Sequence, residues 1–177
     1  MGKLLKIGSH GNSIAVLFLH QHQIYRKLAH SKKAVNVLKQ EYEGIKWYAQ
    51  QQPLENSKLD RLSLTLNGHM LDIPELPGKK VSCEASINCT GKFILKAINH
   101  YNSVWPKLDK APVHGDLTLD NILFYGERVN FFDWEHFNKD GEIWGFDIVY
   151  LTLSAILLND LKKTVISFEE SFLLITW

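Results

Sequence analysis

The sequence predicts an α+β fold in two lobes, an N-terminal antiparallel sheet with one helix followed by a mainly helical C-terminal lobe. Three observations predict this fold. Strand-like segments separated by turns dominate the first 80 residues, one helical pattern interrupts them, and apolar helical segments dominate much of the rest. With 177 residues, 45% of them hydrophobic and 22% charged, the chain is long enough to bury a core and too apolar to be disordered.

The first lobe is expected to start with three strands. Leu4–Ile7 and Ile14–Leu19 are apolar segments on either side of the polar turn 8–13, and this pattern is typical of a hairpin. Gln23–Leu28 follows as the third strand. These segments predict the beginning of an antiparallel sheet.

One helix and a second pair of strands are expected to complete this lobe. Apolar residues recur every three or four positions over 35–50, which predicts a helix with one buried face that ends before Pro53. Alternating apolar residues in 62–66, and the apolar segment 70–76 beyond Asn67-Gly68, predict two further strands.

The second lobe is expected to contain helices and one hairpin. Its predicted elements are a helix over Phe93–Val104 that ends before Pro106, a hairpin of Ile122–Tyr125 and Val129–Asp133 across Gly126-Glu127, a helix over Phe146–Leu158, and the start of another helix in Phe168–Trp177. The segment 83–90 predicts no particular element.

Composition excludes several classes of function. The net charge of +1 comes from 20 Lys and Arg against 19 Asp and Glu, and so small an excess argues against binding nucleic acid by bulk electrostatics. The longest apolar stretches, Ile14–Leu19 and Ile148–Leu158, are shorter than the about 20 residues of a membrane span. Two cysteines, Cys83 and Cys89, are too few for a disulfide scaffold. We therefore expect a cytoplasmic protein with free thiols and no membrane span.

Three polar side chains mark the segment in which chemistry is expected. Asp116 and Asn121 lie five residues apart in a loop before the predicted hairpin, and Asp133 ends the second strand of that hairpin. This order allows the fold to bring their carboxylate and amide oxygens together. Mg²⁺ takes oxygen ligands, and phosphoryl transfer also uses a carboxylate that orients or deprotonates the attacking hydroxyl. The pattern therefore indicates phosphoryl-transfer chemistry.

The same segment resembles the catalytic loop and metal-binding strand of the aminoglycoside phosphotransferase and choline kinase family, whose members are relatives of the protein kinases. The matching residues are His114-Gly115-Asp116 with Asn121 five residues beyond the Asp, an apolar strand ending in Asp133-Trp134-Glu135, and then Gly145-Phe146-Asp147-Ile148. Gly115 stands where the protein kinases have Arg, which favours the branch that acts on small molecules.

The resemblance implies a two-lobed protein-kinase-like fold and a role for each matching residue. It implies that Asp116 is the catalytic base, that Asn121 and Asp133 hold Mg²⁺, and that Asp147 braces the catalytic loop. His114 is expected to support the loop by hydrogen bonding rather than to exchange protons.

A fold of this kind also needs a lysine on a strand to bind the α- and β-phosphates, and a glutamate on the next helix to hold that lysine. Lys27 and Arg26 are the candidate cations, and they face opposite sides of their strand because strand side chains alternate. The family pattern is matched better by Lys27. Glu41 and Glu43 are the candidate glutamates, and the resemblance favours Glu41. The alternative interpretation is an exposed ion pair of little energetic consequence.

The resemblance also implies a nucleotide-covering loop and a hinge. Ser9 and Gly11 lie upstream of the lysine strand, where small residues let backbone N–H groups approach phosphate oxygens. The segment 73–78 lies where the family has its interlobe hinge. The resemblance thus divides the chain into a nucleotide-binding lobe at 1–78 and a catalytic lobe at 79–177, the second either compact or incomplete beside its relatives.

The function implied by the resemblance is that of an ATP- and Mg²⁺-dependent kinase. Its acceptor would be a hydroxyl group of a small molecule such as a sugar, an amino alcohol or an aminoglycoside-like compound. A catalytically inactive nucleotide-binding or interaction protein of the same fold is the alternative. The lack of an Ala-Pro-Glu segment after Asp133 disfavours a protein kinase, and the lack of clustered histidines disfavours a metal-dependent hydrolase. The choice of ATP or GTP, the acceptor, the oligomeric state and the role of Glu135 stay open.

Overall fold

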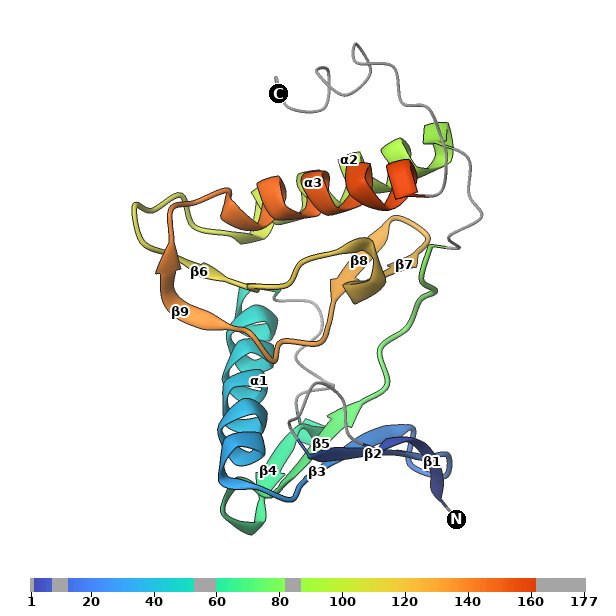
Figure 1. Ribbon diagram of the computed structural model, residues 1–177, viewed down its shortest axis with the longest axis vertical. Coiled ribbons are helices and arrows are strands. Elements are labelled where there is room, and N and C mark those ends of the chain that lie inside the picture. Colours follow the sequence, from blue (N-terminus) through green and yellow to red (C-terminus); the bar gives the residue numbers. More distant parts are fainter. Residues whose placement is uncertain (1, 8–12, 53–59, 82–86, 162–177) are drawn as a thin grey trace. The chain divides into compact units, whose positions relative to one another are not determined.

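The computed structural model describes residues 2–7, 13–52, 60–81 and 87–161 (Figure 1). The described residues form helices and sheets, and the pairs of the five-stranded sheet and of β7–β8 are antiparallel, so the predicted α+β class is confirmed. The chain divides into two compact units. The first consists of Met1–Leu76 together with Asp133–Asn138, and the second of Pro77–Phe132 together with Lys139–Trp177.

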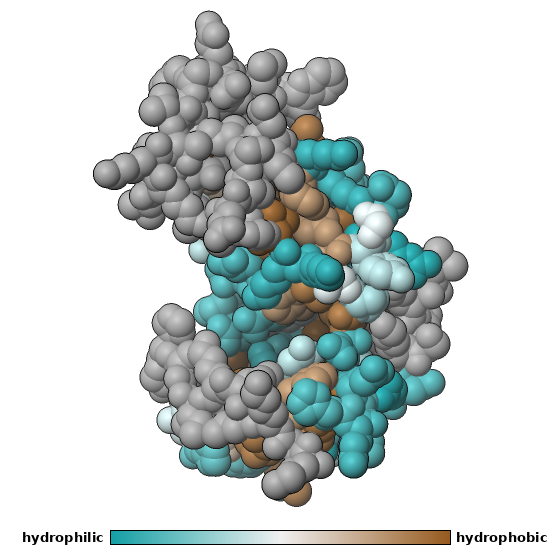
Figure 2. All heavy atoms as spheres, turned by 90° about the vertical axis from the view of Figure 1, so that its right-hand side faces the viewer, coloured by the Kyte–Doolittle hydropathy of each residue, from teal (hydrophilic) through white to brown (hydrophobic). Residues whose placement is uncertain are grey.

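The surface of the described residues is mixed in character. On the face drawn in Figure 2, hydrophilic residues cover much of the described surface and hydrophobic residues are exposed between them. Within the described ranges, none of the helices combines the length and the apolar character that a membrane span requires.

The first unit contains a five-stranded antiparallel sheet. In spatial order its strands are β1 (Gly2–Ile7), β2 (Ile14–Leu19), β3 (Ile24–Ala29), β5 (Met70–Pro74) and β4 (Ser63–Thr65). The expected hairpins are present, although β3 begins one residue later than predicted. Gln23 has φ +50, a conformation that belongs to the turn rather than to a strand.

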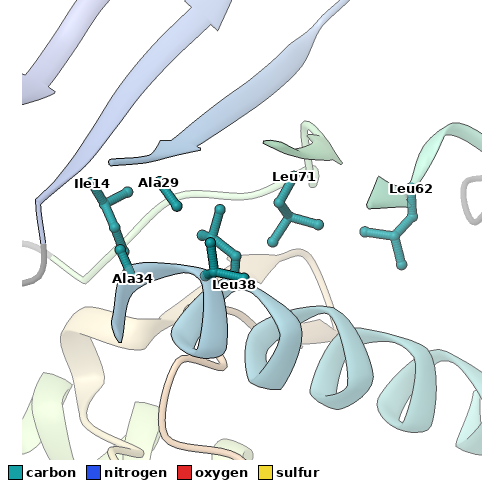
Figure 3. Packing of buried hydrophobic residues seen from close by; sticks show 7 residues of the cluster. Ile14, Ala29, Ala34, Leu38, Leu62 and Leu71 are labelled. Carbon is teal, nitrogen blue, oxygen red and sulfur yellow. The ribbon is translucent and has the colours of Figure 1, made fainter. Parts of the chain in front are cut away.

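Helix α1 (Lys32–Gln51) packs on one face of this sheet. It begins three residues before the predicted start because Ser31 caps it, its hydroxyl accepting a hydrogen bond from the Ala34 backbone N–H at 3.1 Å. Figure 3 shows the core between helix and strands, in which Leu38 of the helix lies near Leu71 of β5. Both leucines are fully buried, and each stabilises the unit by about 1.5–3 kcal/mol.

The second unit contains two helices and two small sheets. Its elements are α2 (Ile87–Val104), β6 (Ala111–Val113), β7 (Ile122–Tyr125), β8 (Arg128–Phe131), β9 (Asn138–Glu142, whose first residue belongs to the first unit) and α3 (Phe146–Leu161). Strands β7 and β8 form the predicted hairpin, and β6 pairs with β9. The second strand was predicted to end at Asp133 but ends at Phe131, because Asp133 has φ +65, which is not a strand conformation. Helices α2 and α3 lie side by side.

Several of these elements differ from the prediction. The sequence did not indicate β9, because its residues are mostly exposed and lack apolar alternation, or β6, which has only three residues and includes a proline. Helix α2 begins six residues before the expected start at Phe93, and α3 continues three residues beyond Leu158. The helix predicted in Phe168–Trp177 lies outside the described residues.

Candidate active site

Lys27 projects from β3 toward α1 and contacts two carboxylates. Its Nζ donates hydrogen bonds to Glu41 Oε1 at 2.7 Å and to Asp133 Oδ1 at 2.9 Å. Arg26 lies on the other face of the strand and binds both carboxylate oxygens of Asp72 at 2.7 Å. Glu43 is exposed on α1. Of the candidate pairs, therefore, Lys27 and Glu41 are the two residues in contact.

Burial and charge act in opposite directions on this cluster of Lys27, Glu41 and Asp133. The side chains of Lys27 and Glu41 are 14% and 1% exposed, whereas that of Asp133 is 38% exposed. Burial alone lowers the pKa of Lys27, but the two carboxylates raise it by more, so its ammonium group stays charged. Burial also raises the pKa of Glu41, and Lys27 opposes that shift. Glu41 Oε2 is buried and has no hydrogen-bond partner among the described residues.

Asp133 is held in place by the residues that follow it. Its backbone has φ +65, a left-handed conformation that Asp tolerates better than most residues but that still costs energy. The next side chain, Trp134, is buried and contacts Tyr48 of α1 at 4.9 Å between ring centroids. Gln40 of α1 donates a hydrogen bond to the Phe137 carbonyl at 2.7 Å. Packing against α1 thus explains why Asp133–Asn138 belongs to the first unit although it follows the β7–β8 hairpin in the sequence.

A glycine on α1 permits this packing. A Cβ added at Gly44 would lie 2.8 Å from the Cβ atoms of both Trp134 and Phe137. We expect Gly44→Ala to lower the free energy of unfolding by about 1–3 kcal/mol through overpacking, although alanine favours a helix by about 0.5–1 kcal/mol. Urea denaturation checks this expectation.

Gly91 on α2 is the matched control for Gly44, because a Cβ added there meets nothing within 4 Å. We expect Gly91→Ala to raise the free energy of unfolding by about 0.5–1 kcal/mol. Equal effects of the two substitutions would show that helix propensity alone governs both positions.

In the second unit, Asp116 and Asn121 are in direct contact. Asn121 Nδ2 donates to the backbone carbonyl of Asp116 at 2.8 Å and to its Oδ2 at 3.1 Å. Asn121 ends the 3-10 turn Leu119–Asn121 that leads into β7, and its carbonyl accepts a hydrogen bond from the Phe132 N–H at 3.1 Å. The loop is thereby tied to the end of the hairpin.

Asp147 braces the start of this loop from α3. Its buried carboxylate accepts hydrogen bonds from the backbone N–H groups of His114 at 2.8 Å and Gly115 at 3.0 Å. Gly115 has φ +82, which glycine adopts without strain. His114 is fully buried, and its Nε2 lies 2.9 Å from the Phe132 carbonyl, so this side chain holds the loop against the hairpin.

The ionisation of Asp147 predicts a pH dependence of stability. Burial raises the pKa of Asp147 from 3.8 to about 6, although the two backbone donors oppose the shift. The folded chain therefore holds this proton more tightly than the unfolded chain, and the contribution of Asp147 to stability falls as the pH rises through this window. As the pH rises from about 3.5 to about 7, the unfolding free energy of wild type is expected to fall relative to that of Asp147→Asn. The expected fall is up to about 3 kcal/mol. Urea denaturation across that range measures the difference, and a pH-independent difference would contradict the assignment.

The structure does not describe every predicted site residue. Ser9 and Gly11 lie outside the described residues. The expected hinge 73–78 includes the boundary between the two units, at Leu76 and Pro77. Asn121 and Asp133, which the resemblance assigns to one metal ion, belong to different units.

One side chain that contacts the loop carries no signal in the local sequence pattern. The hydroxyl of Tyr150, on α3, donates a hydrogen bond to Asp116 Oδ1 at 3.1 Å. In the sequence Tyr150 is one of many apolar or aromatic residues of an apolar helix, so no local signal distinguishes it. Only its placement beside Asp116 reveals the contact.

The contacts of Asn121 with Asp116 are made by its side-chain nitrogen and not by its side-chain oxygen. Its amide nitrogen faces two acceptors of Asp116, which fixes the nitrogen there and turns Oδ1 away. Oδ1 of Asn121 and the Asp133 carboxylate are hard oxygen donors of the kind that Mg²⁺ prefers. The described part of the chain contains no group of three or more His, Cys, Asp or Glu side chains that could hold a metal ion. Taken singly, each of these two side chains, Asn121 and Asp133, supplies a donor of the chemical kind that Mg²⁺ binds together with phosphate oxygens.

Comparisons with known proteins add no family assignment. Neither the protein-family models nor the curated proteins include a match to this sequence.

Proposed function

We propose that the protein is an ATP- and Mg²⁺-dependent phosphotransferase that phosphorylates a hydroxyl group of a small molecule. The single observation that carries the proposal is the contact of the largely buried Lys27, which donates to the buried Glu41 and to Asp133. A buried ion pair contributes little net stability, because apolar residues of similar volume do as well or better. A charged lysine kept at this position is therefore better explained by a ligand of opposite charge, such as the phosphates of a nucleotide.

In this proposal Lys27 binds the α- and β-phosphates. Glu41 orients the Lys27 ammonium group toward them and keeps it charged. Asn121 and Asp133 would hold Mg²⁺, which when bound neutralises phosphate charge during transfer. Asp116 accepts the proton of the acceptor hydroxyl as that oxygen attacks the γ-phosphorus, and the bond from the γ-phosphorus to the bridging oxygen breaks so that ADP leaves. His114 and Asp147 keep the loop in the conformation that presents Asp116.

The same proposal is supported by the resemblance of the loop sequence to the aminoglycoside phosphotransferase and choline kinase family. That resemblance implies a two-lobed protein-kinase-like fold. Gly115 in place of Arg favours a small-molecule acceptor such as a sugar, an amino alcohol or an aminoglycoside-like compound. Cytoplasmic ATP would be the donor.

The alternative is a nucleotide-binding interaction protein of the same fold that has lost catalysis. One observation favours it. Helix α3 has an exposed apolar face made of Phe146, Val149, Leu153 and Leu157, and exposed apolar surface often marks interaction sites. Both candidates predict that Mg-ATP raises the Tm, because a ligand that prefers the folded state stabilises it.

Transfer of phosphate separates the two candidates. The purified chain is incubated with Mg-ATP and a panel of sugars, amino alcohols and aminoglycosides, and products are identified by mass spectrometry. A phosphorylated acceptor is the expected result. Mg-ATP binding without transfer to any acceptor would favour the interaction protein, and failure to bind Mg-ATP would contradict both.

A further inference from the structure

Each oxygen of the Asp116 carboxylate receives a hydrogen bond from a different element. Asn121 Nδ2 donates to Oδ2 at 3.1 Å from the loop itself, and the Tyr150 hydroxyl donates to Oδ1 at 3.1 Å from α3. An ionised carboxylate accepts hydrogen bonds and donates none, so Asp116 is the acceptor in both contacts. Two donors on opposite oxygens restrict rotation of the carboxylate, which a single donor does not.

The Tyr150 hydroxyl is suited to remain a donor. Burial and the negative charge of Asp116 raise the pKa of Tyr150 above its ordinary value. The phenol therefore keeps its proton near neutral pH. Asn121 and Tyr150 together make a stable pair of donors around one carboxylate.

The position of Tyr150 argues against a role in packing alone. The residue is 39% exposed and lies on the same helix face as the exposed Phe146 and Leu153. Its ring therefore adds less packing energy to the core than a fully buried tyrosine ring would. Its described polar contact is the one with Asp116. An exposed hydrogen bond adds little to the stability of a fold, and the consequence of this contact is the orientation of the carboxylate.

We propose that Tyr150 is a positioning residue that holds the Asp116 carboxylate in the orientation needed to accept the acceptor proton. This inference rests on the proposed phosphotransferase function and adds to it a residue outside the loop motif. Helix α3 then acts on the loop at two points, because Asp147 fixes the backbone before Asp116 and Tyr150 fixes its side chain.

The test removes only the hydroxyl. Tyr150→Phe is expected to lower kcat for transfer by about tenfold to a hundredfold through misorientation of Asp116, while the KM for ATP and the Tm stay unchanged. Tyr125→Phe is the matched control, because Tyr125 is an exposed tyrosine at the end of β7, and its kinetics are expected to equal those of wild type. The same Tyr150→Phe change in an Asp116→Ala background is expected to have no further effect, since the group that it positions is gone.

The outcomes distinguish this inference from the function on which it rests. An active wild type with an equally active Tyr150→Phe variant would overturn the positioning role alone. The positioning role would also be overturned if Tyr150→Phe lowered kcat by the same factor in the Asp116→Ala background. That result would show that Tyr150 acts independently of Asp116. A wild-type chain that binds Mg-ATP and transfers no phosphate would overturn the proposed function, and the positioning role with it.

Discussion

Replacement of Asp116 with Asn is expected to lower kcat for phosphate transfer by about two to four orders of magnitude. The amide that replaces the carboxylate does not accept the hydroxyl proton, and it brings an N–H donor to a place where Asn121 and Tyr150 both donate. Since Asp116 is half-buried and Asn has nearly the same size, the free energy of unfolding is expected to change much less than the rate. Initial rates of product formation at saturating Mg-ATP measure the effect.

The matched control for this substitution is Asp120→Asn. Asp120 lies in the same 3-10 turn, is exposed, and carries the same charge, so its loss is expected to leave kcat within about twofold of wild type. Equal rates for wild type and Asp116→Asn would remove Asp116 from the mechanism. Equal losses in both variants would show that the net charge of the loop matters rather than one carboxylate.

Replacement of Lys27 with Met is expected to have the largest effect on stability. Removal of the ammonium group leaves Glu41, whose side chain is 1% exposed, without the cation that balances its charge. The expected cost is about 3–5 kcal/mol of unfolding free energy at neutral pH. The loss is expected to become smaller in acid, because burial favours the protonated form of Glu41. Urea denaturation at two pH values measures both.

A second substitution, at Glu41, removes the buried charge that Lys27→Met leaves unpaired. In the double variant Lys27→Met, Glu41→Leu the buried charge is gone, and Asp133 is exposed enough to be hydrated, so most of the lost stability is expected to return. Lys33→Met, at an exposed position of α1, is the control and is expected to change stability by less than about 0.5 kcal/mol. A double variant no more stable than Lys27→Met would contradict the account of the pair as a charge balance.

Local pattern was enough to predict most of the fold's elements. The helix in 32–51 and the β7–β8 hairpin were predicted because apolar spacing and turn residues are properties of adjacent positions. Strand β9 was missed because its five residues, Asn138–Glu142, are mostly exposed, and its pairing with β6 is set by the surrounding chain. The packing of Trp134 and Phe137 against Gly44 is likewise a contact between distant segments that no local pattern reports.

In the candidate site, too, some residues could be predicted from local sequence and others only from the structure. The proximity of Asp116 and Asn121, two residues of one motif, could be predicted because their spacing is itself the signal. For Lys27 the sequence left Arg26 as an alternative, and the contact with Glu41 is visible only in the structure. Tyr150 was missed, because a tyrosine in an apolar helix carries no mark of the carboxylate that it contacts.

The central claim is that the charged Lys27 cluster binds the phosphates of a nucleotide, and calorimetric titration with Mg-ATP tests it most directly. Wild type and Lys33→Met are expected to bind with equal affinity. The double variant Lys27→Met, Glu41→Leu, once shown by denaturation to be folded, is expected to lose at least about tenfold in affinity, since a charge-assisted hydrogen bond contributes about 1.5 kcal/mol or more. Undiminished binding by that folded double variant would contradict the claim, as would a wild type that does not bind Mg-ATP.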